Sequence, residues 1–286
     1  MKQPFFILGN PRSGTSLLRI ILDSHPNIVV PPECGFIEWL SEKYKDWDFK
    51  KMIGPFIEDL YQTKKFETWN LPKDDLLEVL NKHQPSTYQL TCQHIYFAYG
   101  NKFSKNLSNW GDKNNYYINH VHKLKIIFPD AVFIHLVRDG RDVAASYKKI
   151  NQSDFKSRYK PSLPNTIKNI AIEWVSNLEV INNFFQTLEE NKYITLRYED
   201  LLNSPKQQLT RITSFLDLSY HPDMLNYHKR NQKYDIEPAE TIEWKKKTLE
   251  NIDSSRIGRY KKHLSQIEIT EFDSYADNML SKYFYI

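Results

Sequence analysis

The chain has 286 residues, of which 40% are hydrophobic, 26% charged and 14% aromatic, and this length suits one large α/β domain. The aromatic content excludes a disordered chain, and a formal net charge of only +4 is too small by itself to indicate a nucleic-acid-binding protein. The two cysteines, Cys34 and Cys92, lack zinc-site spacing and are too few for a disulfide scaffold. A mildly basic globular protein with a small anionic ligand is therefore expected.

The N-terminal residues lead directly into an apolar strand, without the charged leader and apolar segment of a signal peptide. No window approaches the roughly 18 apolar residues that cross a bilayer. We therefore expect no membrane span and a cytoplasmic protein whose cysteines stay reduced.

Short apolar runs followed by turn residues alternate with helical patterns along the chain. The predicted strands are 5–8, 27–30, 131–137 and 193–198. The predicted helices are 16–24, 114–128, 141–150, 166–189 and 206–216, with one more at the C-terminus. Such alternation is typical of a parallel sheet flanked by helices. Residues 37–112 predict helices with loops, and the charged stretch 229–255 lacks periodicity and predicts a mobile loop.

Residues 9–16, with the sequence Gly-Asn-Pro-Arg-Ser-Gly-Thr-Ser, lie between a predicted strand and a predicted helix, which is the context of a phosphate-binding loop. Two glycines allow a sharp turn with inward N–H groups, and the helix start adds partial positive charge. The segment matches G-x-x-x-x-G-K-[ST], except that Thr15 replaces the lysine that serves β and γ phosphates. Arg12 instead puts a cation in the loop. We therefore predict an anion site rather than a plain strand–helix turn.

Arg138 ends a predicted strand and so lies at the carboxyl edge of the sheet, where open α/β folds bind ligands. Ser146 follows on the next predicted helix. Two interpretations stay open for this segment. The arginine and the hydroxyl clamp a second phosphate, or Arg138 forms a surface pair with an aspartate.

Three further segments indicate a function only when they are considered together, because each one alone also fits a purely structural role. Glu33, after the second predicted strand, is either a base for an acceptor hydroxyl or an acid at a helix N-terminus. Lys113, in the Gly-Asp-Lys stretch that opens a predicted helix, is either a stabiliser of a transferring group or a solvated lysine. Residues 254–262 are basic and hydroxylated. Three interpretations stay open for them: a loop that wraps an anionic ligand, the start of a solvated helix, or a weak nucleic-acid patch.

Four segments resemble those of sulfotransferases that use 3′-phosphoadenosine 5′-phosphosulfate (PAPS). They are residues 11–18, similar to the 5′-phosphosulfate loop; 138–146, similar to the 3′-phosphate segment; 197–216, similar to the later strand–helix block; and 255–260, similar to the loop that closes over the nucleotide. Their order and distances match as well. Arg12 in the first loop and Glu33 after the next strand make the tyrosylprotein-sulfotransferase-like and bacterial branch the most similar. Lys113 matches a lysine of that branch, although Asn114 departs from its pattern.

The resemblance implies an α/β fold: a P-loop-like three-layer sandwich with a central parallel sheet flanked by helices. It implies a single domain over residues 1–286, with a helical and loop elaboration at about 37–112. A nucleotide-closing loop is expected at about 229–263.

The resemblance also implies in-line transfer of a sulfuryl group from PAPS to a hydroxyl or amine, releasing 3′-phosphoadenosine 5′-phosphate (PAP), with no metal. Glu33 is then the general base, and Arg12 and Lys113 neutralise the sulfuryl oxygens and the bridging oxygen. The implied nucleotide-binding residues are Arg12, Ser13, Gly14, Thr15, Ser16, Arg138, Ser146, Tyr198, Ser255, Arg256 and Gly258.

The acceptor stays open among small molecules, saccharides, lipids and peptides, and so does a homodimer; no nucleic-acid partner is expected. Two other functions are kept as alternatives. A P-loop kinase or nucleotidase is disfavoured by Thr15 in the lysine position and by Arg138 where a strand-terminal aspartate is needed. A non-catalytic nucleotide-binding module is disfavoured by Glu33, which binding alone does not need.

Overall fold

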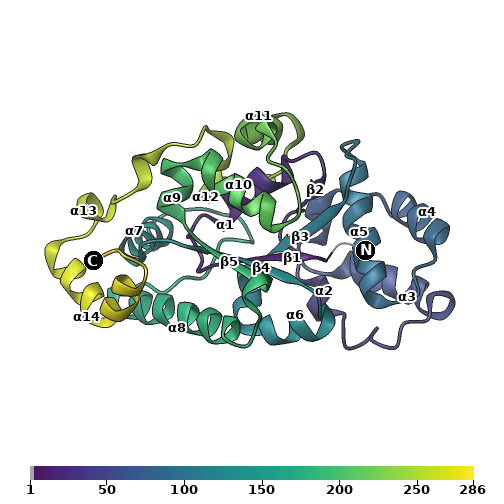
Figure 1. The fold of residues 1–286 in the computed structure, drawn as a ribbon, viewed down its shortest axis with the longest axis horizontal. Helices are drawn as coiled ribbons and strands as arrows, with labels where there is room; N and C mark the ends of the chain where they lie inside the picture. The colour runs from purple at the N-terminus through teal and green to yellow at the C-terminus, as the bar shows by residue number, and fades with distance from the viewer. Residues whose placement is uncertain (1–2) are drawn as a thin grey trace.

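The computed structural model describes residues 3–286, which fold around a central sheet of five parallel strands with the order β2-β3-β1-β4-β5 (Figure 1). The strands are β1 Phe5–Leu8, β2 Ile28–Val29, β3 Asn109–Lys113, β4 Val132–Val137 and β5 Tyr193–Arg197. Helices cover both faces of this sheet. The predicted α/β fold with a parallel sheet between helical layers is therefore confirmed.

Strand β1 shows why a continuous apolar run in the sequence predicted a strand. All four of its residues are buried, and their side chains alternate between two hydrophobic clusters. Phe5 and Ile7 pack on one side of the sheet, whereas Phe6 and Leu8 pack on the other. Parallel sheets are covered on both faces, so their strands appear as continuous apolar runs.

One face of the sheet is covered by helices that follow the strand ends. They are α1 Thr15–Asp23, α9 Tyr198–Asn203, α10 Pro205–Phe215, η4 Pro222–Asn226, α11 Tyr227–Tyr234, α12 Ala239–Lys245 and η5 Lys246–Leu249. Leu18, Leu201 and Leu209 of this layer are fully buried in one cluster with the sheet. In Figure 1 this layer lies above the strands.

The opposite face is covered by helices from three parts of the chain. They are η2 Asn115–His120, α6 Val121–Ile127, α7 Gly140–Asn151, α8 Ile167–Phe185, α13 Tyr260–His263 and α14 Gln266–Lys282. Two one-turn helices lie outside this layer: η3 Glu190–Lys192 has no buried residue, and η6 Ser254–Arg256 contacts α9. Residues 36–101 add α2 Phe36–Trp39, α3 Phe49–Gln62, η1 Phe66–Trp69, α4 Lys73–His83 and α5 Tyr88–Asn101. The last three α-helices lie beyond the β2–β3 end of the sheet (Figure 1).

The expectation that residues 111–113 open a helix is wrong, because these residues belong to β3. All five residues of β3 are buried, and the strand pairs with β1 so that Ile7 lies opposite Lys113. The carboxylate of Asp112 accepts hydrogen bonds from the hydroxyls of Tyr96 and Tyr117, each at 2.6 Å. Because a buried polar group is tolerated when it has such partners, a strand forms here without an apolar pattern. The helix predicted over 114–128 is correspondingly split into η2 and α6.

The expectation of a mobile loop over residues 229–255 is also wrong, since α11, α12 and η5 occupy most of it. Polar contacts hold these helices. The Asn231 side-chain amide donates to the Thr248 carbonyl at 3.0 Å, and the Glu237 N–H donates to the Asn231 amide oxygen at 2.7 Å. A segment stabilised by buried polar groups has no hydrophobic periodicity to detect.

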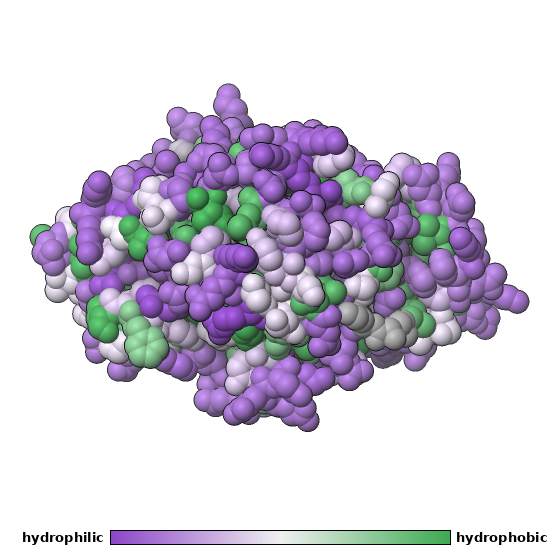
Figure 2. Space-filling view, turned by 45° about the horizontal axis from the view of Figure 1, so that its top comes forward, coloured by the Kyte–Doolittle hydropathy of each residue, from purple (hydrophilic) through white to green (hydrophobic). Residues whose placement is uncertain are grey.

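The exterior is mainly hydrophilic on the face drawn in Figure 2, with hydrophobic side chains in small separate areas. Across residues 3–286, no helix has both the length and the apolar character needed to cross a membrane.

Candidate functional site

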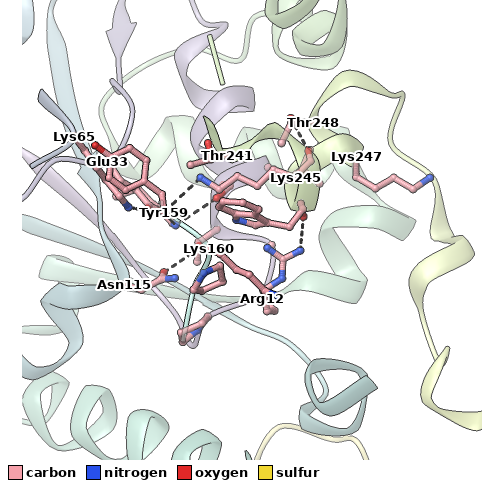
Figure 3. A pocket seen from close by; sticks show the side chains of 18 of the residues that line it. Arg12, Glu33, Lys65, Asn115, Tyr159, Lys160, Thr241, Lys245, Lys247 and Thr248 are labelled. Atoms are coloured by element: carbon pink, nitrogen blue, oxygen red, sulfur yellow. Dashed lines mark hydrogen bonds and ion pairs between the residues drawn. The ribbon is translucent and has the colours of Figure 1, made fainter. Parts of the chain in front are cut away.

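A cavity of about 410 Å³ lies at the carboxyl ends of the strands. The loop after β1, the segment after β2 and the ends of β3, β4 and β5 all contribute to it (Figure 3). The predicted site residues that line it are Arg12, Gly14, Thr15, Ser16, Glu33, Lys113, Arg138, Tyr198 and Arg256. Residues far apart in the sequence and predicted from separate motifs therefore share one cavity.

The loop between β1 and α1 has the backbone of an anion site. Gly14 adopts φ +94°, and a Cβ there would lie 2.5 Å from the Tyr198 ring, so only glycine fits this turn. Within residues 3–286, no side chain caps the N-terminus of α1. The first-turn N–H groups of Thr15 and Ser16 are thus available to an anion, and the helix dipole favours it.

Arg12 connects the loop to two other elements. Its backbone is left-handed, with φ +70°. Its guanidinium donates to the Ser146 hydroxyl at 3.2 Å and to the Trp244 carbonyl at 2.7 Å. Burial, together with the nearby cations Arg138 and Arg256, lowers the pKa of Arg12 to about 10, so the side chain is still charged at neutral pH. Such a half-buried cation, whose hydrogen bonds go to a hydroxyl and a carbonyl rather than to a carboxylate, is suited to an anionic ligand.

Arg138 lies where β4 ends and is held on several sides. It donates to the carbonyls of Arg12 and Arg256 at 3.1 and 3.0 Å, and its guanidinium lies over the Tyr198 ring at 4.7 Å. Asp142 accepts from the Gly258 N–H at 3.0 Å and so ties the 254–260 segment to α7. The second and fourth predicted segments therefore meet at Arg138.

The other predicted nucleotide residues lie beside the main cavity. Ser146 lines an adjoining pocket of about 50 Å³ together with Arg138 and Arg256. Ser255 and Gly258 line a third pocket with Arg256. Ser13 is buried in the loop. The arrangement offers two neighbouring anion positions, one at the start of α1 and one around Arg138 and Ser146.

Glu33 and Lys113 form a buried ion pair. The Lys113 ammonium donates to Glu33 Oε1 and lies 3.3 Å from the Ser16 hydroxyl. Lys65 donates to the other carboxylate oxygen, Oε2, at 2.8 Å, and Lys245 Nζ lies 3.8 Å from Oε1. A carboxylate with three lysines around it stays ionised, and both of its oxygens are occupied.

Burial and charge oppose each other in this cluster. Burial acts to raise the pKa of Glu33, but Lys113, Lys245 and Lys65 hold that pKa well below its usual value. Burial lowers the pKa of Lys113 to about 8, against the raising effect of Glu33, and the charge of Lys245 also lowers it. Lys113 is thus a cation that loses its proton just above neutral pH.

Several lining residues were missed by sequence reasoning. They include Lys64, Lys65, Asn115, Arg158, Tyr159, Lys160, Thr241, Trp244, Lys245, Lys247 and Thr248. Lys65 carried one local signal, a place in a Lys-Lys pair beside an aromatic residue, which is too common to be informative. Lys245 lies in the stretch that lacked periodicity, so no pattern located it.

Among residues 3–286, no three histidine, cysteine, aspartate or glutamate side chains come together as a metal-binding group. The positive charge in the cavity comes from lysine and arginine. Three of these, Arg12, Lys113 and Arg138, end or follow strands of the sheet.

Comparison with known sequences gives one family. The sulfotransferase family model matches residues 4–222. Protein-tyrosine sulfotransferase A of Caenorhabditis elegans is 25% identical over 231 residues, which is 79% of this chain and 53% of that protein. Protein-tyrosine sulfotransferase 1 of Danio rerio is 28% identical over 229 residues, 78% of this chain and 56% of that protein. The chain therefore spans about half the length of these relatives.

Comparison with solved structures gives the same fold. The sulfotransferase domain of the Synechococcus PCC 7002 olefin synthase matches with a TM-score of 0.58 and 21% identity over 96% of both chains. The sulfotransferase domain from the curacin biosynthetic pathway matches with a TM-score of 0.57 and 20% identity, over 96% of this chain and 97% of that one. The resemblance to the tyrosylprotein-sulfotransferase-like branch is confirmed, and because the family model spans more than half of its residues, the chain belongs to the sulfotransferase family.

Proposed function

We propose that the protein transfers the sulfuryl group of PAPS to an acceptor hydroxyl, with Glu33 as the general base. One observation carries this proposal. The loop before α1, the cations Arg12 and Lys113, and the carboxylate of Glu33 line the same cavity. A phosphate site alone has no need of a carboxylate, which repels the anion. A transferase needs both.

The polar groups of the cavity suit a donor with two anionic ends. Among the described residues, the Ser13 hydroxyl and the Nε atoms of Arg138 and Arg256 are buried without a hydrogen-bond partner. Such groups are costly unless a ligand satisfies them. The 5′-phosphosulfate would lie at the start of α1, with the 3′-phosphate near Arg138 and Ser146.

The reaction is an in-line displacement at sulfur. The acceptor oxygen forms a bond to the sulfur, the bond from sulfur to the 5′-phosphate oxygen breaks, and the acceptor proton moves to a Glu33 carboxylate oxygen. PAP leaves with the bonding electron pair. Arg12 and Lys113 stabilise the charge that grows on the sulfuryl and bridging oxygens.

Binding of the donor would also activate the base. In the ligand-free site Lys113 donates to both Ser16 and Glu33, and this contact makes Glu33 a weak proton acceptor. When Lys113 turns to the bridging oxygen of PAPS, Glu33 loses its nearest cation and its proton affinity rises. Donor binding therefore does two things at once: it brings Lys113 to the bridging oxygen and makes Glu33 a stronger base.

We propose a tyrosine hydroxyl flanked by acidic residues as the acceptor. The named relatives are protein-tyrosine sulfotransferases, and Lys64, Lys65, Arg158 and Lys160 line the same cavity as Glu33. Basic side chains at this position favour an acceptor that carries negative charge near its hydroxyl. A cytoplasmic location, a single domain and the absence of a nucleic-acid partner remain part of the proposal.

Transfer from radiolabelled PAPS to two tyrosine peptides tests this function. A peptide with acidic flanking residues is expected to be sulfated with a lower KM than a matched peptide with neutral flanks. Arg158, with a side chain 67% exposed, contributes as a surface charge, so Arg158→Ala should raise KM for the acidic peptide by roughly two- to fivefold.

The control is Arg211→Ala, which removes an exposed arginine on α10 and should leave both KM values unchanged. If neither peptide accepts label while PAPS is still hydrolysed, tyrosine is the wrong acceptor. If both peptides react equally well, the basic side chains do not select the acceptor.

A further inference from the structure

A row of alternating buried charges runs from α1 to the reacting end of the cavity. The Arg19 guanidinium donates to Glu237 at 2.7 Å, and the two side chains are each 1% exposed. Glu237 Oε1 accepts from Lys245 Nζ at 2.6 Å. Lys245 Nζ in turn lies 3.8 Å from Glu33 Oε1. The row therefore ends on the carboxylate that the proposed function uses as its base.

Helix α12 positions the ammonium group of Lys245. Lys245 is its last residue and its side chain is 9% exposed, while the preceding residue, Trp244, accepts the Arg12 guanidinium at its carbonyl. Figure 3 shows Lys245 extending toward Glu33, whereas Lys247 points away from this cluster. One short helix thus contacts the cationic loop residue and approaches the carboxylate.

Stability alone does not account for a lysine here. Glu237 already has a buried partner in Arg19, and it also accepts the Thr241 hydroxyl at 2.5 Å. Bringing a second cation, the Lys245 ammonium, out of water costs several kcal/mol before any pairing. Burial acts to raise the pKa of Glu237, but Lys245 and Arg19 lower it to about 2, so this carboxylate is a permanent negative anchor for Lys245.

The geometry points to Lys245 as a positioning residue for sulfuryl transfer, fixed by Glu237 so that a positive charge stays beside Glu33 when Lys113 turns to the donor. This inference rests on the proposed function. Lys113 hydrogen-bonds the same Glu33 oxygen that Lys245 approaches. Lys65 remains on the other oxygen, Oε2. With Lys245 held back by Glu237, Lys113 is the cation that can leave Oε1, and Lys245 keeps a positive charge beside that oxygen in its absence.

The charged groups around Glu33 determine in which direction its pKa changes when Lys245 is removed. Lys113, Lys65 and Lys245 favour its ionised form. The carboxylate of Asp112, which interacts with Glu33, and that of Glu237, which lines a pocket with it, carry like charge and act in the opposite direction. Loss of Lys245 should raise the pKa of Glu33. It should also raise the pKa of Lys113, because the charge of Lys245 lowers that pKa and Glu237 raises it. Both limbs of the pH profile should therefore move toward higher pH.

The test compares Lys245→Met with Lys246→Met, which removes the neighbouring exposed lysine. With PAPS and the acidic tyrosine peptide, Lys245→Met should lower kcat roughly 10- to 100-fold, because Lys113 then stays with Glu33 instead of turning to the donor. This loss is smaller than that from removing a group that contacts the transition state. Its kcat/KM profile should shift upward in pH on both limbs, and Lys245→Arg should restore the profile. A kcat within twofold of Lys246→Met, with unmoved limbs, would overturn the inference.

A measurement without catalysis separates this inference from the proposed function. Competitive labelling with trace acetic anhydride from pH 6 to 11, read by mass spectrometry, reports the midpoint of Lys113. It should lie near about 8 in the native protein, rise in Lys245→Met and fall in Glu237→Gln, which removes a nearby negative charge. Absence of sulfuryl transfer in the native protein would defeat the proposed function. An unmoved Lys113 midpoint in either variant would defeat the role of Lys245.

Discussion

Replacing Arg12 with alanine is expected to lower kcat by roughly 10²–10³-fold, the loss typical of removing one preorganised donor at a developing charge. Arg12 is a half-buried cation in the loop between β1 and α1, and its guanidinium reaches both Ser146 and the Trp244 carbonyl. A donor that bridges the two anion positions would lie against this side chain. Steady-state kinetics with saturating PAPS measures the effect.

Two control variants separate the charge of Arg12 from its shape. Arg12→Lys keeps a cation but loses the planar fork that contacts two partners at once, so it should recover only part of the rate. Arg211→Ala removes an exposed arginine on α10 and should turn over as the native enzyme does. Near-full turnover by Arg12→Ala would remove this residue from the catalytic machinery.

Replacing Glu33 with glutamine is expected to lower kcat by roughly 10²–10⁴-fold, because the acceptor hydroxyl loses its proton acceptor. Glutamine keeps nearly the same shape and does not change the volume of the cavity, so PAP affinity should change far less than kcat. The variant also removes the counter-charge of Lys113 and Lys65. Binding and rate measured on the same preparation distinguish loss of the base from loss of the fold.

The pH–rate profile of Glu33→Gln should differ from that of the native enzyme in a defined direction. Three lysines hold the pKa of Glu33 below its usual value, so the base is ionised throughout the neutral range and the native rate should be flat there. The rate should fall as Lys113, with a pKa of about 8, loses its proton. Because Glu33 raises that pKa, Glu33→Gln should move the falling limb to lower pH. An unmoved limb with an undiminished rate would show that Glu33 is not the base.

The sequence predicted the part of the site that is built on apolar strands. Runs such as Phe5–Leu8 are buried on both faces and end at the carboxyl edge of the sheet, so the residues that follow them had to meet. Arg12 and Arg138 were located on this physical ground, and the structure brings both to one cavity. The resemblance to a known family rested on the same segments.

Polar segments were not predictable in the same way. Strand β3 contains Asp112 and Lys113, whose partners are distant in the chain: Asp112 accepts a hydrogen bond from Tyr96, and Lys113 forms an ion pair with Glu33. Lys245 depends on Glu237 and, through it, on Arg19. No local window contains such pairs, so periodicity misassigned β3 as the opening of a helix and left α12 as a loop.

Calorimetric titration of the purified protein with PAP, with and without Mg²⁺ and alongside ATP, shows directly whether the cavity binds the product nucleotide of sulfuryl transfer. We expect tight binding that requires the 3′-phosphate and does not depend on Mg²⁺, because the two anion positions are built from Arg12, Arg138, Ser146 and the start of α1. Binding of ATP with Mg²⁺ in place of PAP would contradict this expectation and favour a kinase or nucleotidase.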